Sequence, residues 1–113
     1  MQALERARAA VRILEEHRAF DTVILDLTGL EAVADYFVLA SGRNPIQLRA
    51  QADALREELP AERPVRPEGY QAGRWICLDY GDVVVHLFTE EAREFYDLDR
   101  LWRDARRVEA AAP

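Results

Sequence analysis

The N-terminal segment carries apolar residues at the spacing of a helix. They recur three or four positions apart, which aligns them along one helical face. The aligned residues are Leu4, Ala7, Val11 and Leu14. Two short runs rich in β-branched and aromatic residues follow at 22–27 and 36–40, a composition typical of strands. Because the second run is apolar on both faces, we expect it to lie centrally in a sheet.

The clearest helix start is at Asn44. Asparagine can cap a helix, Pro45 suits the first helical position, and Gln47 occupies the capping-box position. An apolar stripe then continues through Leu48, Ala52, Leu55 and Leu59. Three prolines break this pattern, so residues 60–73 are expected to form a connection with room for one short edge strand.

The strongest local pattern is a hairpin over residues 74–88. Its two strand-like runs, RWICLDY and VVVHLF, flank Gly81-Asp82, a pair suited to a two-residue type II′ turn. A turn at this point fixes which residues face each other across the two strands. The resulting pairs are Tyr80–Val83, Asp79–Val84, Leu78–Val85, Cys77–His86, Ile76–Leu87 and Trp75–Phe88.

The last helix is expected to begin after Thr89, which can cap it. Glu90 and Glu91 in its first turn favour the positive end of the helix dipole. Its apolar side is predicted to contain Ala92, Phe95, Leu98, Trp102 and Ala105. We expect one domain over residues 1–107 and a frayed tail over 108–113. The order of elements predicts an α/β (α+β) fold, with a mixed β-sheet and helices mainly on one face.

Side-chain alternation along the hairpin separates two faces. The expected core face is almost wholly apolar and contains Ile76, Leu78, Tyr80, Val83, Val85 and Leu87. The mixed face contains Trp75, Cys77, Asp79, Val84, His86 and Phe88. Aromatic anchors beside a carboxylate and an imidazole suit an interface with a partner or a second copy. Alternatively, Trp75 and Phe88 lie beneath a helix and His86 is an ordinary hydrogen-bonded sheet residue.

The charge balance favours a protein partner over a nucleic acid. Fifteen basic residues, all of them arginine, stand against 21 acidic ones, so the net charge is −6. This charge opposes binding to phosphate backbones and suits a basic protein. The lack of lysine excludes Schiff-base and Walker-type chemistry. With a single cysteine, Cys77, and no run long enough to span a bilayer, we expect a protein of the reducing cytoplasm with no membrane partner.

Three arrangements for metal binding or catalysis can be drawn, and none has the context that its chemistry needs. His17 and His86 are too few for a metal site without a cysteine pair. The only serine, Ser41, lacks the GxSxG elbow that would support a triad. Cys77 opposite His86 has better geometry, but a small cysteine in an apolar strand usually serves packing. We therefore expect no catalytic residue, no metal and no cofactor.

Four blocks of the chain together resemble the ribosomal silencing factor family, whose members are also called iojap-like proteins. The blocks are DYFVLASGRN at 35–44, EGY at 68–70, RWICLDYGDVVVHLF at 74–88 and REFYDLDRLWRDA at 93–105. They occur in the family's order and span nearly the whole chain, so the resemblance is more specific than any single short motif. It implies a fold similar to that of nucleotidyltransferases, without their active site.

The resemblance also implies a function. Members of this family are non-enzymatic factors that bind a basic protein of the large ribosomal subunit, the fourteenth (uL14), and sterically block subunit joining. Translation is thereby lowered when nutrients are scarce. Carried over by the matching block, the expected contact residues are Trp75, Asp79, Tyr80, Asp82 and His86. The two aspartates could pair with arginine or lysine on the partner, and the tryptophan could supply buried area.

Two other functions stay open at this point. A metal-dependent enzyme of nucleotidyl transfer would use paired carboxylates, for which Asp79 with Asp82 and Asp97 with Asp99 are the candidates. Neither pair follows a glycine-rich phosphate loop. A structural homodimer would instead bury the mixed hairpin face against its copy.

Overall fold

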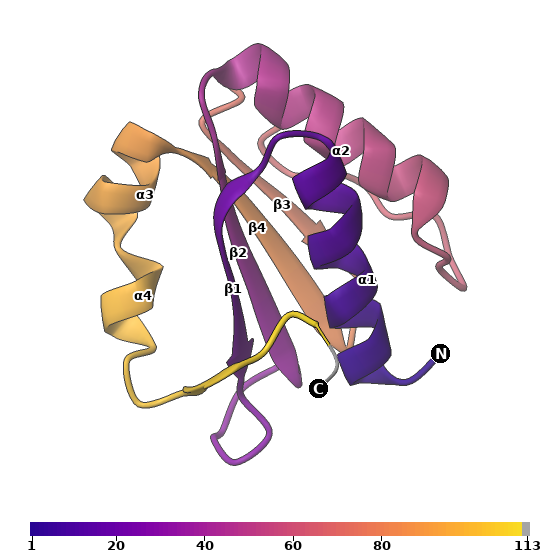
Figure 1. The fold of residues 1–113 in the computed structure, drawn as a ribbon, viewed down its shortest axis with the longest axis vertical. Helices are drawn as coiled ribbons and strands as arrows, with labels where there is room; N and C mark the ends of the chain where they lie inside the picture. Colours follow the sequence, from indigo (N-terminus) through magenta and orange to yellow (C-terminus); the bar gives the residue numbers. More distant parts are fainter. Residues whose placement is uncertain (112–113) are drawn as a thin grey trace.

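The computed structural model describes residues 1–111, which contain four helices and five strands (Figure 1). The first helix, the first four strands and the second helix follow the order that the hydrophobic pattern predicts, whereas the last predicted helix is divided in two and a fifth strand follows it. The elements are α1 (Ala3–Glu16), β1 (Phe20–Asp26), β2 (Tyr36–Gly42), α2 (Pro45–Glu58), β3 (Trp75–Asp79), β4 (Val83–Thr89), α3 (Glu90–Tyr96), α4 (Leu98–Leu101) and β5 (Arg106–Val108).

The strands form one mixed sheet in the order β3-β4-β2-β1-β5. Strand β2 is central, parallel to β4 and antiparallel to β1, which confirms the position predicted from its apolar faces. The hairpin register matches the predicted one in all five pairs between β3 and β4. The Tyr80 N–H donates to the Val83 carbonyl at 2.9 Å, and Gly81 has a φ of 89°, which only glycine adopts without strain.

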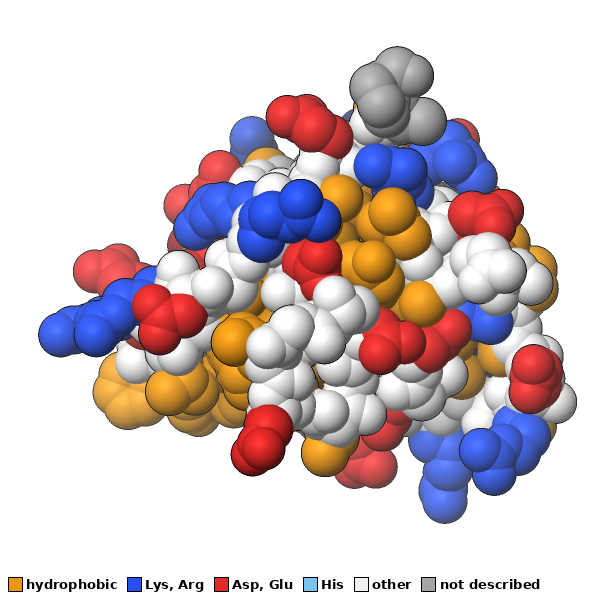
Figure 2. All heavy atoms as spheres, turned by 90° about the horizontal axis from the view of Figure 1, so that it is seen from below, with side chains coloured by type: hydrophobic (Ala, Val, Ile, Leu, Met, Phe, Trp, Pro, Cys, Tyr) orange, Lys and Arg blue, Asp and Glu red, His pale blue; other side chains and the backbone are white. Residues whose placement is uncertain are grey.

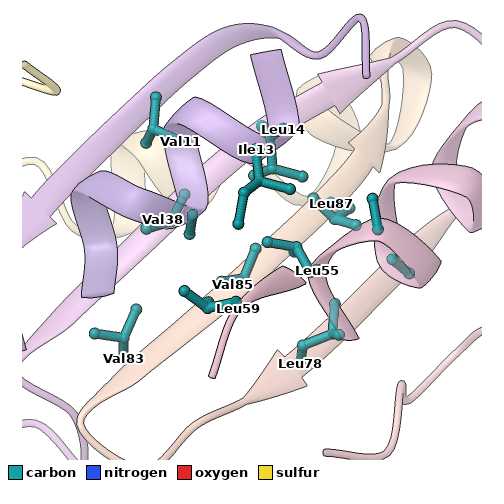
Figure 3. Packing of buried hydrophobic residues seen from close by; sticks show 14 of the residues in the cluster. Val11, Ile13, Leu14, Val38, Leu55, Leu59, Leu78, Val83, Val85 and Leu87 are labelled. Atoms are coloured by element: carbon teal, nitrogen blue, oxygen red, sulfur yellow. The ribbon is translucent and has the colours of Figure 1, made fainter. Parts of the chain in front are cut away.

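Helices α1 and α2 cover one face of the sheet, and the main core lies between them and the strands (Figures 1 and 3). The predicted apolar face of the hairpin supplies five fully buried side chains: Ile76, Leu78, Val83, Val85 and Leu87. The predicted stripe of α2 is also buried: Leu48, Ala52, Leu55 and Leu59. Full burial of an aliphatic side chain of this size contributes about 1.5–3 kcal/mol, so this layer is a major source of stability.

Both predicted N-caps are present. The Asn44 side chain accepts a hydrogen bond from the Gln47 N–H at 2.8 Å, and the Gln47 side chain accepts one from the Arg43 N–H at 2.8 Å. The Thr89 hydroxyl accepts a hydrogen bond from the Ala92 N–H at 3.3 Å. These bonds satisfy backbone donors that the first helical turns leave without partners. They fix where α2 and α3 leave the sheet.

The prediction of one continuous last helix is wrong at Asp97. This residue adopts a left-handed conformation, with φ 48° and ψ 54°, and ends α3. Its carboxylate then accepts a hydrogen bond from the Arg100 N–H at 3.3 Å, which caps α4. Aspartate enters this conformation more readily than most residues because its short side chain bonds to the local backbone. The break leaves Phe95 exposed, whereas Ala92, Leu98 and Ala105 remain buried as predicted.

The two remaining segments also differ from expectation. Residues 60–73 contribute a single bridge to the sheet edge, between Glu68 and Cys77, rather than a strand. Val108, which the sequence places in a frayed tail, pairs with Ile24 as part of β5. Three residues are too short a run for hydrophobic periodicity to reveal. Residues 112–113 of the expected tail lie outside the described residues.

Candidate protein-docking surface

The mixed face of the hairpin is covered on β4 and accessible on β3. Helices α3 and α4 lie on this side of the sheet, opposite α1 and α2 (Figure 1). On β4, His86 and Phe88 are buried. On the edge strand β3, Trp75 and Cys77 are half-buried and Asp79 is exposed. Both interpretations of this face therefore hold in part: Phe88 packs beneath α3, and the β3 side chains remain accessible.

Trp75 and His86 are joined by a hydrogen bond from the indole Nε1 to the imidazole Nδ1, at 3.1 Å. Because Nδ1 accepts, the neutral ring carries its proton on Nε2, which is buried with no hydrogen-bond partner among the described residues. Burial lowers the pKa of His86 to about 4, against a weaker opposing effect of the Asp79 carboxylate. The ring is therefore neutral at neutral pH and supports the indole rather than carrying charge.

Trp75 also belongs to a row of aromatic rings that runs from the core to the surface. The centre of its ring lies 5.1 Å from the centre of the Phe88 ring and 4.6 Å from that of the Tyr96 ring. The centres of the Tyr96 and Phe95 rings lie 5.0 Å apart. Phe88 is fully buried at one end of the row, and Phe95 is exposed at the other. Paired aromatic rings hold one another in defined orientations. The outer rings therefore form a preorganised apolar surface.

Cys77 has the properties of a packing residue. Burial raises the pKa of its thiol to about 11, and the carboxylates of Asp79 and Glu68 add to the shift. A thiol with this pKa is protonated at neutral pH and is a poor nucleophile. Although Cys77 lies opposite His86 in the hairpin, the two side chains do not make a reactive pair.

Tyr80 and Asp82 are engaged on the side of the sheet that α1 and α2 cover. The Asp82 Oδ1 lies 3.2 Å from Nε of Arg6, which is buried on α1; this is an ion pair in which the N–H is not aligned for a hydrogen bond. The Arg6 guanidinium also lies 5.8 Å from the centre of the Tyr80 ring. The Tyr80 hydroxyl donates to the Leu55 carbonyl at 3.3 Å. The structure thus divides the five predicted contact residues between two sides of the hairpin.

Arg93 and Asp99 form an ion pair that sequence reasoning missed. The Arg93 Nε donates to Oδ2 of Asp99 at 2.9 Å, and Nη2 donates to Oδ1 at 3.1 Å. Nη1 donates to the Ser41 hydroxyl and to the Asp21 carbonyl, both at 2.9 Å. The two hydrogen bonds that Arg93 donates to the Asp99 carboxylate lower the pKa of that carboxyl group. A spacing of six residues is not that of neighbours on a helix, so only the break at Asp97 brings the two side chains together.

The four carboxylates considered for metal-dependent chemistry each have a local structural partner. The Asp79 carboxylate accepts a hydrogen bond from the Gly81 N–H at 2.7 Å, and the Asp82 carboxylate pairs with Arg6 of α1. Asp97 caps α4, and Asp99 pairs with α3. Within residues 1–111, no three or more His, Cys, Asp or Glu side chains gather as they would around a metal ion. The same stretch includes no helix with the length and apolar character needed to cross a bilayer.

Comparison with known proteins confirms the resemblance. The family model described as ribosomal silencing factor during starvation matches residues 1–113. Ribosomal silencing factor RsfS of Halalkalibacterium halodurans is 36% identical over 112 residues, which cover 96% of this chain and 95% of that protein. Mitochondrial assembly of ribosomal large subunit protein 1 of Mus musculus is 32% identical over 97 residues, which cover 81% of this chain and 42% of that protein. A crystal structure of a Chromobacterium violaceum protein, 27% identical, has a TM-score of 0.84 and covers 100% of this chain and 95% of that one. The chain belongs to the ribosomal silencing factor family.

Proposed function

We propose that this protein binds the large ribosomal subunit through uL14 and sterically blocks its joining to the small subunit, so that translation is repressed in the cytoplasm. The observation that carries the proposal is the match of the whole chain to one family model. The murine relative is named for assembly of the large ribosomal subunit, which supports that subunit as the partner. The proposed activity requires binding alone, without a reaction or a cofactor.

The accessible side of the hairpin has the chemistry of a docking surface. Trp75 offers a half-buried ring whose orientation His86 fixes, and such preorganised aromatic side chains are common anchors of interfaces. Asp79 offers an exposed carboxylate that can pair with arginine or lysine. Tyr80 and Asp82 shape the turn through their contacts with Arg6. We propose that Trp75 and Asp79 make the contact, that His86 holds the indole in place beneath it, and that Tyr80 and Asp82 hold the turn in place.

The charge of the protein supports a basic protein as the immediate partner. A net charge of −6 attracts a positively charged protein surface and is repelled by ribosomal RNA phosphates. The same charge therefore accelerates encounter with the proposed partner and disfavours binding elsewhere on the subunit.

The dimensions of the protein are sufficient for a steric block. Its principal extents are 34 × 30 × 26 Å. Contacts between macromolecular surfaces need separations of about 4 Å, so a bound body of this size on the joining face excludes them. Occupancy of the site, rather than any change in the subunit, would prevent joining.

Co-sedimentation with separated ribosomal subunits tests the proposal. The protein is expected to travel with large subunits and not with small ones, and to reduce the joined fraction when both subunits are mixed. If it travels with neither subunit, the proposal is wrong. Light scattering over a range of concentrations, with and without large subunits, identifies the alternative: a dimer that persists in their presence would favour a structural homodimer.

A further inference from the structure

Three large apolar side chains are exposed where α3 meets α4. The exposed fraction is 76% for Phe95, 71% for Leu101 and 44% for Tyr96. Together with neighbouring polar residues they line a surface hollow of about 640 Å³. We call these three residues the apolar corner. Seen from below, apolar side chains are exposed at the left of Figure 2, the side on which α4 lies in Figure 1.

The apolar corner is not required to attach α3 and α4 to the sheet. Ala92 and Leu98 make the buried apolar contacts of these two helices, and Arg93 makes the polar ones. Phe95 and Leu101 point into solvent instead. Clusters of exposed apolar side chains are uncommon on soluble domains and often mark interaction sites. The exposure of these two residues therefore needs an explanation other than folding.

The apolar corner is continuous with the accessible side of the hairpin, which carries Trp75 and Asp79. The Tyr96 ring lies between those of Phe95 and Trp75, at 5.0 Å from the first and 4.6 Å from the second. A partner that covers Trp75 would therefore meet the apolar corner within the same footprint.

Acidic side chains outnumber basic ones around the apolar corner. Residues 90–99 contain five carboxylates and one arginine, which gives a local charge of −4, and that arginine is paired with Asp99. The hollow itself is lined by Glu94, Asp97 and Asp104 and by Arg100 and Arg103. On α3, Glu91 and Phe95 are four residues apart and share a face. An apolar centre whose surroundings carry more carboxylates than guanidinium groups matches a basic protein surface better than nucleic-acid phosphates.

We propose that the apolar corner is a second docking element, which seats an apolar side chain that projects from a basic protein surface of the large subunit. This inference rests on the proposed function and extends its contact surface from the hairpin onto α3 and α4. The hollow between Phe95 and Leu101 receives the apolar side chain, and the carboxylates of Glu91 and Glu94 face the surrounding basic residues.

The test is a binding titration with isolated large ribosomal subunits. The double variant Phe95→Ser/Leu101→Ser removes the apolar centre, and Ile46→Ser is the matched control, since Ile46 is 75% exposed at the start of α2. We expect the double variant to bind at least about tenfold more weakly, as for loss of an interface anchor, and the control to bind as wild type does. Glu91→Gln/Glu94→Gln should bind more weakly at low salt and lose part of the salt dependence. All variants should keep the thermal midpoint of wild type, because the residues are exposed.

The outcomes separate this inference from the proposed function. If wild type binds large subunits and the double variant binds equally well, the inference is wrong and the proposed function stands. If wild type does not bind, both are wrong. If the double variant converts a dimer to a monomer in light scattering and still binds large subunits as wild type does, the apolar corner is a self-association surface and the inference is wrong.

Discussion

The guanidinium of Arg93 binds the carboxylate of Asp99 through two hydrogen bonds, of 2.9 and 3.1 Å, across the break between α3 and α4. The same guanidinium reaches the Ser41 hydroxyl on β2 and the Asp21 carbonyl on β1. One side chain thus connects both short helices to two strands of the sheet. Because the apolar corner lies on these helices, the ion pair also fixes its position beside the hairpin.

Substitution of Arg93 should destabilise the protein. Arg93→Met leaves the partly buried carboxylate of Asp99 with only Arg107, at 3.8 Å, and we expect the free energy of unfolding to fall by about 1–3 kcal/mol. Arg93→Lys should lose less, since an ammonium group keeps the charge but cannot form the two parallel bonds. Urea unfolding measures both values. Arg100→Met, at an exposed arginine, is the control, and a loss no larger than that of the control would show that the pair contributes nothing.

His86 should make stability depend on pH in a defined window. Its pKa is about 4 in the folded protein and 6.5 as the ordinary value, so the unfolded chain binds the extra proton between these limits. The stability that the neutral His86 ring contributes is fully present above pH 6.5. It is lost as the pH falls from 6.5 to 4, and the total loss in the free energy of unfolding is roughly 3 kcal/mol. His86→Phe should lose this part of the dependence, as measured by urea unfolding at pH 7 and pH 4.5. His17→Gln, at a partly exposed histidine, should retain it; equal pH dependence in wild type and His86→Phe would contradict the account.

The two aspartates of the hairpin turn should have different roles. Asp79→Asn keeps the oxygen that accepts the Gly81 N–H but removes an exposed charge, so large-subunit binding should weaken several-fold with unchanged stability. Asp82→Asn removes the charge that pairs with Arg6, so stability should fall by about 1 kcal/mol with little effect on binding by the folded protein. Binding titrations and urea unfolding of both variants measure the contrast. If Asp82→Asn weakens binding more than Asp79→Asn does, the assignment is reversed.

The hairpin was predictable because its signals are local. Glycine at Gly81 specifies the turn, and strict alternation on both sides specifies which side chains are buried, so register and core face follow together. The helix cap at Asn44 is local in the same sense. For the same reason alternation places Trp75 and Asp79 on the mixed face, but it leaves open whether Trp75 is accessible or lies beneath a helix.

The rest depends on contacts between distant parts of the chain. The ion pair between Arg6 and Asp82 joins residues 76 positions apart, and no spacing rule reveals that it occupies Asp82. The break at Asp97 converts a helical stripe into two short helices, which exposes Phe95 although its spacing predicts burial. A cap signal was available at this point, since an aspartate can both end one helix and begin the next, but the apolar periodicity continues across it and conceals the break.

We propose that the accessible side of the hairpin holds this protein on the large subunit and thereby prevents subunit joining. The most direct measurement is gradient sedimentation of mixed ribosomal subunits with wild type, Trp75→Ala and Trp75→Phe, each first shown to be folded by circular dichroism. We expect wild type to lower the joined fraction, Trp75→Phe to retain part of this effect through its ring, and Trp75→Ala to have almost none. If folded Trp75→Ala lowers the joined fraction as much as wild type does, the hairpin is not the surface that acts.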